Sequence, residues 1–216
     1  MCSVSQSRVR RLRAENVRLW AKTSGRFVRT TDSDHRLPVA GNILDRDVEP
    51  ANPNEPGCAD ITYIPTREGW LYPAVVEGLF SHKIAGGSMD QTMESRLVVD
   101  ARSAAMTRRR PGGGLLAHSD RGSRYASEHY QGRSREERIT CSMSGVGQCR
   151  DNAPMESFFG RLKREIASGE MFAARDQARA EIFEYPEVFD NRVRLHPSPG
   201  LRSPDAFERT CNQKRR

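Results

Sequence analysis

Two short segments rich in β-branched and aromatic residues, 58–64 and 71–79, restrict the fold of this chain more than any other feature. A turn at residues 65–69 separates them, and a third strand is expected at 82–89. Strands that follow one another this closely pair as an antiparallel meander. A meander needs a second layer to cover its apolar face, so the rest of the chain must supply helices that pack on it.

Helical and strand patterns alternate after the meander. Residues 92–109 have the period of a helix, with Met93, Leu97 and Ala101 on one face, and Pro111 ends it. The other expected elements are a strand at 115–119, a helix at 124–137, a strand at 139–144, and helices at about 152–167 and 175–192. This order predicts an α/β fold with a mixed five-stranded sheet flanked by helices.

Positive charge is concentrated at the N-terminus. The formal net charge is +7, and residues 1–30 hold eight Lys or Arg against one acid, so this segment alone accounts for it. A basic arm of this kind favours contact with nucleic-acid phosphates, and a solvated tail without a partner is the alternative. The arginines that we expect to contact DNA here are Arg8, Arg10, Arg11 and Arg13.

Composition excludes several other classes of protein. No run reaches the roughly 18 apolar residues of a membrane span, and the N-terminus lacks the apolar stretch of a secretory signal. The five cysteines are odd in number and show no C-x-x-C spacing, which argues against a disulfide framework or a zinc site. A reducing cytoplasm fits this usage.

The chain divides into three expected parts. Residues 1–22 include a short basic helix at 5–20, which is too short to bury its own apolar side. Residues 23–56 are polar, rich in Pro and Asn, and aperiodic, so we interpret them as a linker. The folded core is expected at 57–210.

Three acids stand at key positions of this expected core. Asp60 lies on the first strand, Asp120 directly follows the strand at 115–119, and Glu156 lies one turn into the helix that begins near residue 152. Carboxylates on rigid elements suit hard divalent cations, and two such ions about 3.5–4 Å apart catalyse phosphoryl transfer. The pattern indicates a metal-dependent site, although three acids among 28 carry little weight without the residues around them.

Several neighbours of the acids are candidate site residues. Asn152 and Lys163 share a helix face with Glu156, so we expect them to face substrate phosphate. Arg121 and Arg124 would either pair with DNA phosphate or be solvated at a helix end. His118 shares the strand face of Asp120, where a contact with metal-bound water and a structural role are both open.

Resemblance to a known family is carried by six segments in order: ADITYIPT, LYPAVV, HSDRGSRYAS, CSMS, DNAPMESFFGRLK and NRVRLHPSPGLRSPDAFE. They resemble bacterial insertion-sequence transposases with a retroviral-integrase-like (DDE) catalytic core. The resemblance implies a ribonuclease-H-like fold and a catalytic, metal-binding triad of Asp60, Asp120 and Glu156. It also implies two Mg²⁺ or Mn²⁺ ions, cleavage of transposon ends, and joining of the 3′-hydroxyl to target DNA.

The same resemblance sets the expected domains and partners. It makes 57–210 an integrase catalytic core and 1–22 a helical remnant of a DNA-binding region. Expected partners are transposon-end and target DNA, further copies of the chain assembled on DNA, and an upstream helix-turn-helix protein of the same element. The expected location is the bacterial cytoplasm, at the nucleoid, with no membrane association. A structure-selective nuclease of the same fold is disfavoured, because the matching segments are those of transposases.

Some positions depart from the family pattern. Gly57 and Gly87 stand where the family commonly has Trp, Pro73 and Pro186 fall inside expected regular elements, and residues 132–138 are charged where an apolar helix should pack. We interpret the chain as a transposase catalytic protein that is a truncated or decaying copy. A non-catalytic DNA-binding remnant of a transposase is the alternative function.

Overall fold

The computed structural model describes residues 35–44, 50–145, 152–166, 171–198 and 200–214. The expected N-terminal helix at 5–20 lies outside these residues, as do Arg8, Arg10, Arg11 and Arg13.

Twelve elements follow one another in the described chain. They are β1 (Pro56–Ile61), β2 (Ile64–Thr66), β3 (Gly69–Gly78), β4 (Lys83–Asp90), α2 (Ser95–Arg109), β5 (Leu116–Ser119), α3 (Glu128–Glu136), β6 (Thr140–Met143), α4 (Ala153–Ile166), α5 (Arg175–Glu184), the π-helix η2 (Tyr185–Asp190) and α6 (Pro204–Lys214). The strands form one sheet in the order β2-β3-β1-β5-β6, with β4 paired to β3. β3 is antiparallel to β1, β2 and β4, whereas β5 is parallel to β1 and β6, so the predicted mixed sheet is confirmed.

The sheet has six strands, one more than expected, because the predicted strand at 58–64 is interrupted. β1 ends at Ile61 and β2 starts at Ile64. At the interruption, the Thr62 N–H donates to the Pro73 carbonyl at 2.9 Å. Both backbone groups of a strand residue point to the same side, so the N–H that Pro73 lacks would also face Thr62. Pro73 therefore removes a backbone hydrogen bond to Thr62, at a point where β1 has already ended. The pairing of β3 with β4 stays intact.

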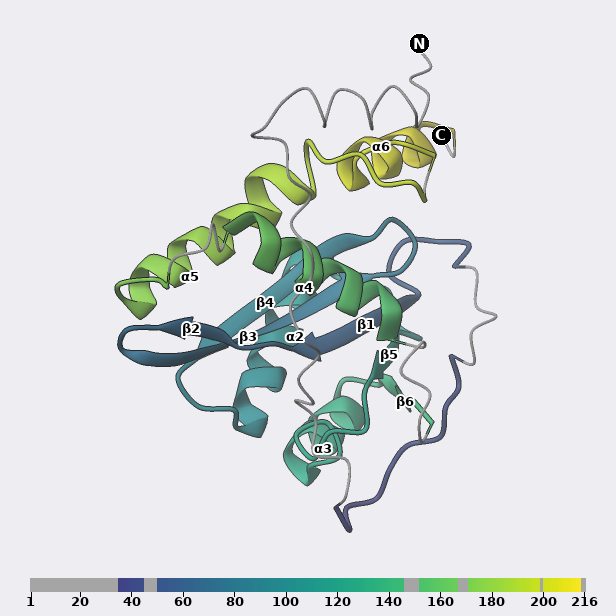
Figure 1. Cartoon of the computed structure of the whole chain (residues 1–216). Coiled ribbons are helices and arrows are strands. Elements are labelled where there is room, and N and C mark those ends of the chain that lie inside the picture. Colours follow the sequence, from purple (N-terminus) through teal and green to yellow (C-terminus); the bar gives the residue numbers. More distant parts are fainter. Residues whose placement is uncertain (1–34, 45–49, 146–151, 167–170, 199, 215–216) are drawn as a thin grey trace, which may run out of the picture.

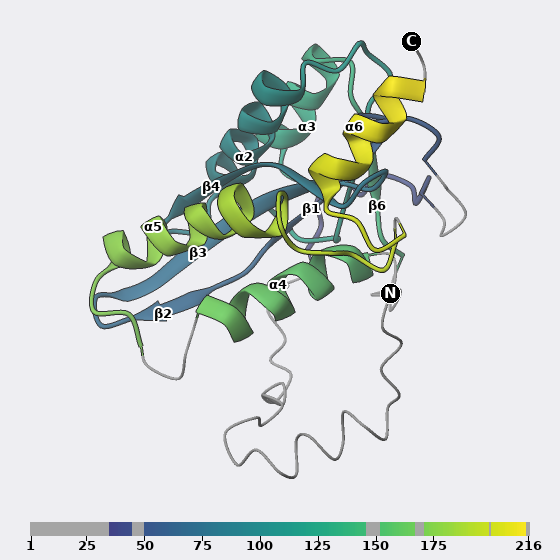
Figure 2. The same ribbon diagram turned by 90° about the horizontal axis from the view of Figure 1, so that it is seen from above.

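Helices cover both faces of the sheet (Figures 1 and 2). α4 and α5 cover one face, where Phe158, Leu162 and Ile182 pack on Cys58 and Val75. α2 and α3 cover the other face. There the buried cluster contains Ala59, Leu97, Val98, Tyr125 and Tyr130. β1 and β3 each contribute residues to both clusters, which fixes their register strongly.

One glycine sets the approach of α2 to the sheet. A Cβ atom built on Gly86 in β4 would lie 2.4 Å from the Ala105 backbone nitrogen and 2.7 Å from its Cα. No side chain fits in that space. Small residues on both sides let the backbones of α2 and β4 come close together.

The charged segment at 132–138 packs on the core through a buried arginine. Arg102 of α2 is 3% exposed, and its guanidinium lies 4.5 Å from the centre of the Tyr130 ring. It donates to the Ser134 hydroxyl and lies 3.3 Å from the Glu137 carboxylate. α3 is polar here because it supplies the partners of this arginine.

The C-terminal part differs from the expectation of a last helix at 175–192. α5 passes into η2 at Pro186, where the Asn191 N–H donates to the Pro186 carbonyl at 3.1 Å. The wider π-turn accommodates the proline within a continuous helical path.

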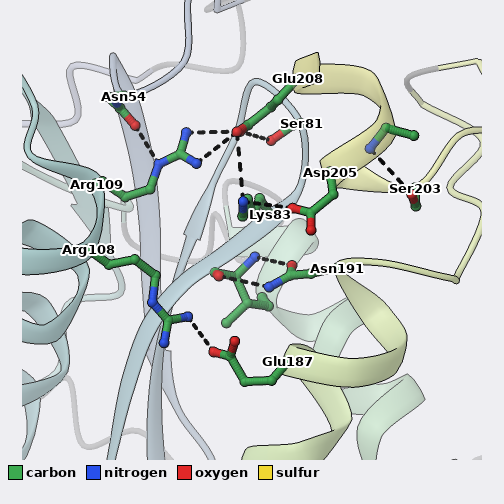
Figure 3. A network of polar contacts seen from close by, with 12 residues as sticks. Asn54, Ser81, Lys83, Arg108, Arg109, Glu187, Asn191, Ser203, Asp205 and Glu208 are labelled. Atoms are coloured by element: carbon green, nitrogen blue, oxygen red, sulfur yellow. Dashed lines mark hydrogen bonds and ion pairs between the residues drawn. The ribbon is translucent and has the colours of Figure 1, made fainter. Parts of the chain in front are cut away.

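A further helix, α6, was not expected. Arg109 of α2 donates from two guanidinium nitrogens to Glu208, each at 2.8 Å, and Lys83 lies 2.7 Å from Asp205 (Figure 3). Phe207 packs on Phe80 with ring centres 5.1 Å apart. Ion pairs between residues far apart in the sequence hold much of α6, and no local sequence pattern signals such contacts.

Part of the expected linker contacts the core. The Ile43 and Leu44 N–H groups donate to the Ser142 hydroxyl at 2.9 and 3.1 Å, and Leu44 is buried in the cluster beneath α4. Among the described residues, no helix is both long and apolar enough to cross a bilayer.

Candidate active site

Asp60 and Asp120 stand at matching ends of neighbouring parallel strands. Ala59 of β1 pairs with Ser119 of β5, and each of the two acids is the next residue along its strand. Carboxyl ends of adjacent parallel strands meet at one edge of a sheet, which is where functional groups of such folds collect. The register therefore brings together two acids that are sixty residues apart in the sequence.

Burial dominates the electrostatics of Asp60. Burial, and after it the charges of Asp120 and Glu156, raise the pKa of Asp60 to about 8. Two hydrogen bonds act in the opposite direction. The Ile61 N–H donates to Asp60 Oδ1 at 2.8 Å, and the Asn152 side chain also bonds this carboxylate. All three predicted acids are therefore close enough to interact.

Asp120 and Glu156 are positioned by different local structures. The Gly122 N–H donates to Asp120 Oδ1 at 2.9 Å, which fixes the carboxylate over the turn that follows β5. Glu156 lies exposed in the first turn of α4, where the helix dipole favours an acid. The buried Met155 and Phe158 anchor that turn on the sheet.

The donor set fits hard divalent cations in kind. It consists of carboxylate oxygens on three elements, and Asp60 in particular has a charged form that its surroundings disfavour. Within the described ranges, no three His, Cys, Asp or Glu side chains lie close enough to surround a single ion. Substrate phosphate and water would have to supply the remaining ligands of any ion held here.

Asn152 and Lys163 both lie next to Asp60. Asn152 is 6% exposed, and its Oδ1 has no hydrogen-bond partner. Lys163 Nζ lies 4.2 Å from the centre of the Tyr63 ring. Burial lowers the pKa of Lys163, whereas the charge of Asp60 raises it. Their contact with DNA phosphate stays a prediction.

The remaining candidates have mainly structural contacts. Arg124 Nε donates to the Met93 carbonyl at 3.0 Å. Arg121 is half-buried, and its Nε is buried without a hydrogen bond. His118 is fully buried, with Nδ1 at 2.9 Å from the Ser142 hydroxyl and Nε2 at 3.1 Å from that of Ser144. Both of its ring nitrogens are occupied, which favours the structural role.

Two aromatic residues of the site were missed by reasoning from the sequence. Tyr125 is buried behind the acids. Burial raises the pKa of its hydroxyl well above the usual value, and the charges of Asp60 and Asp120 add to this effect. Tyr63 lies under Lys163. Both tyrosines occur within the recognised segments, HSDRGSRYAS and ADITYIPT, and that position was the available signal.

Comparisons with known proteins agree with this geometry. Two family models, both described as integrase core domain, match residues 50–149 and 156–210. The "Insertion element IS600 uncharacterized 31 kDa protein" of Shigella sonnei is 42% identical over 97% of this chain and 77% of its own length. The "Transposase InsF for insertion sequence IS3fB" of Escherichia coli (strain K12) is 42% identical over 91% of this chain and 68% of its own length.

Solved structures of retroviral integrases share the fold. A chain of the simian T-cell lymphotropic virus intasome, in complex with PP2A regulatory subunit B56 gamma, superposes with a TM-score of 0.59 at 13% identity, over 82% of this chain and 60% of its own. The HTLV-2 integrase catalytic core domain in complex with magnesium gives 0.51 at 16% identity, over 73% and 98%. The fold is ribonuclease-H-like, as predicted. The chain therefore belongs to the bacterial insertion-sequence transposases with an integrase core domain, which are DDE polynucleotidyl transferases.

Proposed function

We propose that Asp60, Asp120 and Glu156 are the catalytic triad of this transposase and that they bind two Mg²⁺ or Mn²⁺ ions. The observation that carries the proposal is the strand register that brings Asp60 and Asp120 to the same edge of the sheet, with Glu156 near enough to raise the pKa of Asp60. Bound cations would supply charge stabilisation to the attacking and leaving oxygens of a phosphoryl transfer. The oxygen-only donor set is what such ions require.

The chain's own residues have separate tasks in this proposal. Asp60, held by the Ile61 N–H and by Asn152, is the carboxylate that interacts with both other acids. Asp120 is held by the Gly122 N–H, and Glu156 is carried by α4. Lys163 places a positive charge next to the site, where it would orient a DNA phosphate. A water first attacks the phosphodiester at the transposon end, and the released 3′-hydroxyl then attacks target DNA.

The proposed partners follow from the family. The substrates are transposon-end and target DNA, and the N-terminal arginines Arg8, Arg10, Arg11 and Arg13 would contact the phosphate backbone. Joining two ends to one target requires more than one catalytic centre, so we expect a homo-oligomer on DNA. An upstream helix-turn-helix protein of the same element would supply end recognition, and the nucleoid would be the place of action.

Cleavage and binding must be measured together to test this function. A labelled duplex with the terminal repeat of the element is incubated with Mg²⁺ and with wild type or Asp120→Asn. Asparagine keeps an oxygen for the Gly122 N–H and removes the charge. We expect nicking and joining by wild type alone, with equal DNA binding by both proteins. Equal binding with no cleavage by a folded wild type would instead support the non-catalytic remnant.

A further inference from the structure

Three side chains stack between α4 and the β2–β3 hairpin: one from α4, one from the residue that precedes β2, and one from β3. Lys163 Nζ lies 4.2 Å above the Tyr63 ring, and the Tyr63 and Trp70 rings meet edge to face with centres 5.1 Å apart. Trp70 is 47% exposed, although it is among the largest apolar side chains of the protein. We refer to Lys163, Tyr63 and Trp70 together as the hairpin stack.

Neighbouring residues hold Trp70 in a fixed position. It pairs with Pro65 across the hairpin, and the next pair, Leu71 with Ile64, is buried in the core beneath α4 and α5. The Trp70 carbonyl accepts a hydrogen bond from Arg175 Nε at 3.2 Å. An exposed aromatic ring on such a rigid support loses little conformational freedom when it binds a ligand.

The hairpin stack is continuous with the candidate active site. Tyr63 follows Asp60 by three residues. The charge of Asp60 raises the pKa of Lys163, so the lysine lies within electrostatic reach of the acids. Through Tyr63, the exposed Trp70 is thus connected to Lys163 of α4, the helix that also carries Glu156.

Positive charge surrounds the hairpin stack. Arg67 is exposed in the turn, and a Cβ on Gly69 would lie 2.8 Å from an Arg175 guanidinium nitrogen, so this cation lies on the hairpin. The acid at the turn is Glu68, whose carboxylate accepts the Arg175 backbone N–H at 2.8 Å. Two arginines therefore lie beside the stack, which contains Lys163 itself, whereas Glu68 is the acid of the turn. Aromatic rings among cations are typical of surfaces that bind unpaired nucleic acid.

We propose that Trp70 stacks on an unpaired nucleobase of the DNA substrate next to the cleaved phosphodiester, while Lys163 contacts the adjacent phosphate. An aromatic side chain reaches the face of a base only where the base has left the duplex stack. The preferred substrate is therefore a DNA end with unpaired nucleotides beside the cut. This inference rests on the proposed function of the Asp60 site.

Fluorescence of Trp70 tests the stacking directly. The chain has two tryptophans, Trp20 and Trp70, so the full-length Trp20→Phe variant reports on Trp70 alone. It is titrated with a terminal-repeat duplex that carries a short unpaired extension, and with the same duplex in which the unpaired nucleotides are abasic. We expect strong quenching by the first DNA and little by the second, which has the same charge. Equal quenching by both would overturn the proposal.

Binding by variants gives a second, independent measurement. Trp70→Ala should weaken binding of the extended duplex roughly ten-fold, which is within the range of one base–aromatic stack. Trp70→Phe should retain most of the affinity, because it keeps an aromatic face. Phe183→Ala is the matched control, since Phe183 is 59% exposed on α5. If Trp70→Ala binds as tightly as Phe183→Ala, with melting temperatures equal to wild type, the stack has no role in binding.

The two proposals fail in distinguishable ways. In one outcome, Asp120→Asn abolishes metal-dependent cleavage, and both DNAs quench Trp70 equally. That outcome would retain the catalytic triad and reject the role of the hairpin stack. Quenching that requires the bases, in a protein that cleaves no DNA, would retain the stack as a DNA-binding surface and reject the triad's activity.

Discussion

Asp60 and Asp120 each follow one member of a residue pair, Ala59 and Ser119, that joins the parallel strands β1 and β5. Sheet hydrogen bonding therefore brings the two backbones together, and the turn after β5 orients the Asp120 carboxylate. Two like charges held this way repel each other until a cation lies between them. This repulsion should lower the stability of the metal-free protein, and a bound metal ion should remove the repulsion.

Stability in the absence of metal should depend on pH through Asp60. Its pKa is about 8 in the folded chain and 3.8 ordinarily, so the folded state holds the proton more tightly. The free energy of unfolding should then fall as pH rises from about 4 to 8, by at most roughly 1.4 kcal/mol per pH unit. Thermal melts with EDTA would show the fall, and Mg²⁺ should reduce it near pH 8.

Asp60→Asn isolates this contribution from other buried titrating groups. Asp190 and His196, whose pKa values are about 6 and about 4, titrate in the same range and are present in both proteins. The variant should lose the part of the pH dependence that Mg²⁺ suppresses. An unchanged pH dependence in Asp60→Asn would assign the effect to those other groups.

Two glycines beneath α2 should respond to alanine in opposite ways. A Cβ on Gly57 would make ordinary contacts, at 3.4 and 3.7 Å, beside a cavity of about 50 Å³ that Ala105, Leu116 and Tyr130 also line. Gly57→Ala should stabilise the fold by about 0.4–1 kcal/mol, because it restricts the unfolded chain. Chemical denaturation would measure the gain, and a loss would mean that the cavity is not accessible to the new methyl group.

Gly86→Ala is the matched counterpart on β4, which β3 separates from β1. Its Cβ would overlap the Ala105 backbone, so α2 would have to move from the sheet. The expected loss is about 1–3 kcal/mol, as for other overpacked cores. If both variants are equally stable, the backbones of α2 and β4 do not lie as close together as described.

Arg102 should contribute more to stability than an exposed arginine of the same helix. Arg102→Met leaves the buried Ser134 hydroxyl and Tyr130 carbonyl without this donor and should cost roughly 3 kcal/mol. Arg108, which pairs with Glu187, is 41% exposed, so Arg108→Met should cost less than about 1 kcal/mol. Urea denaturation of both variants tests the difference. Equal effects would show that the polar packing of α3 adds no stability.

Local pattern predicted much of the fold. β3, β4 and α2 were expected within a few residues, because strand composition and helical periodicity are local signals. The partners of Arg102 and the docking of α6 depend on residues far apart in the sequence, and the contact of Tyr63 with Trp70 depends on the register of the β2–β3 hairpin. The hydrophobic periodicity of a segment contains no information on such contacts, so these features could not be predicted.

The candidate site, like the fold, could be predicted only in part from the sequence. The triad was named through family resemblance, since three acids among the 28 of the chain do not by themselves indicate a site. The hydrogen bond from Asn152 to Asp60 and the position of Tyr125 required the structure. Pro73 and Pro186 looked damaging in sequence, yet each falls where the backbone has an alternative: the end of β1 and the π-turn of η2.

The most direct test of the central claim is the single-turnover rate of Mg²⁺-dependent nicking at the terminal repeat, measured for wild type, Asp60→Asn, Asp120→Asn and Glu156→Gln. If these acids form the catalytic triad, each substitution should lower the rate on the order of a thousand-fold or more while DNA binding persists. A variant that cleaves at the wild-type rate would remove its residue from the triad and contradict the assignment.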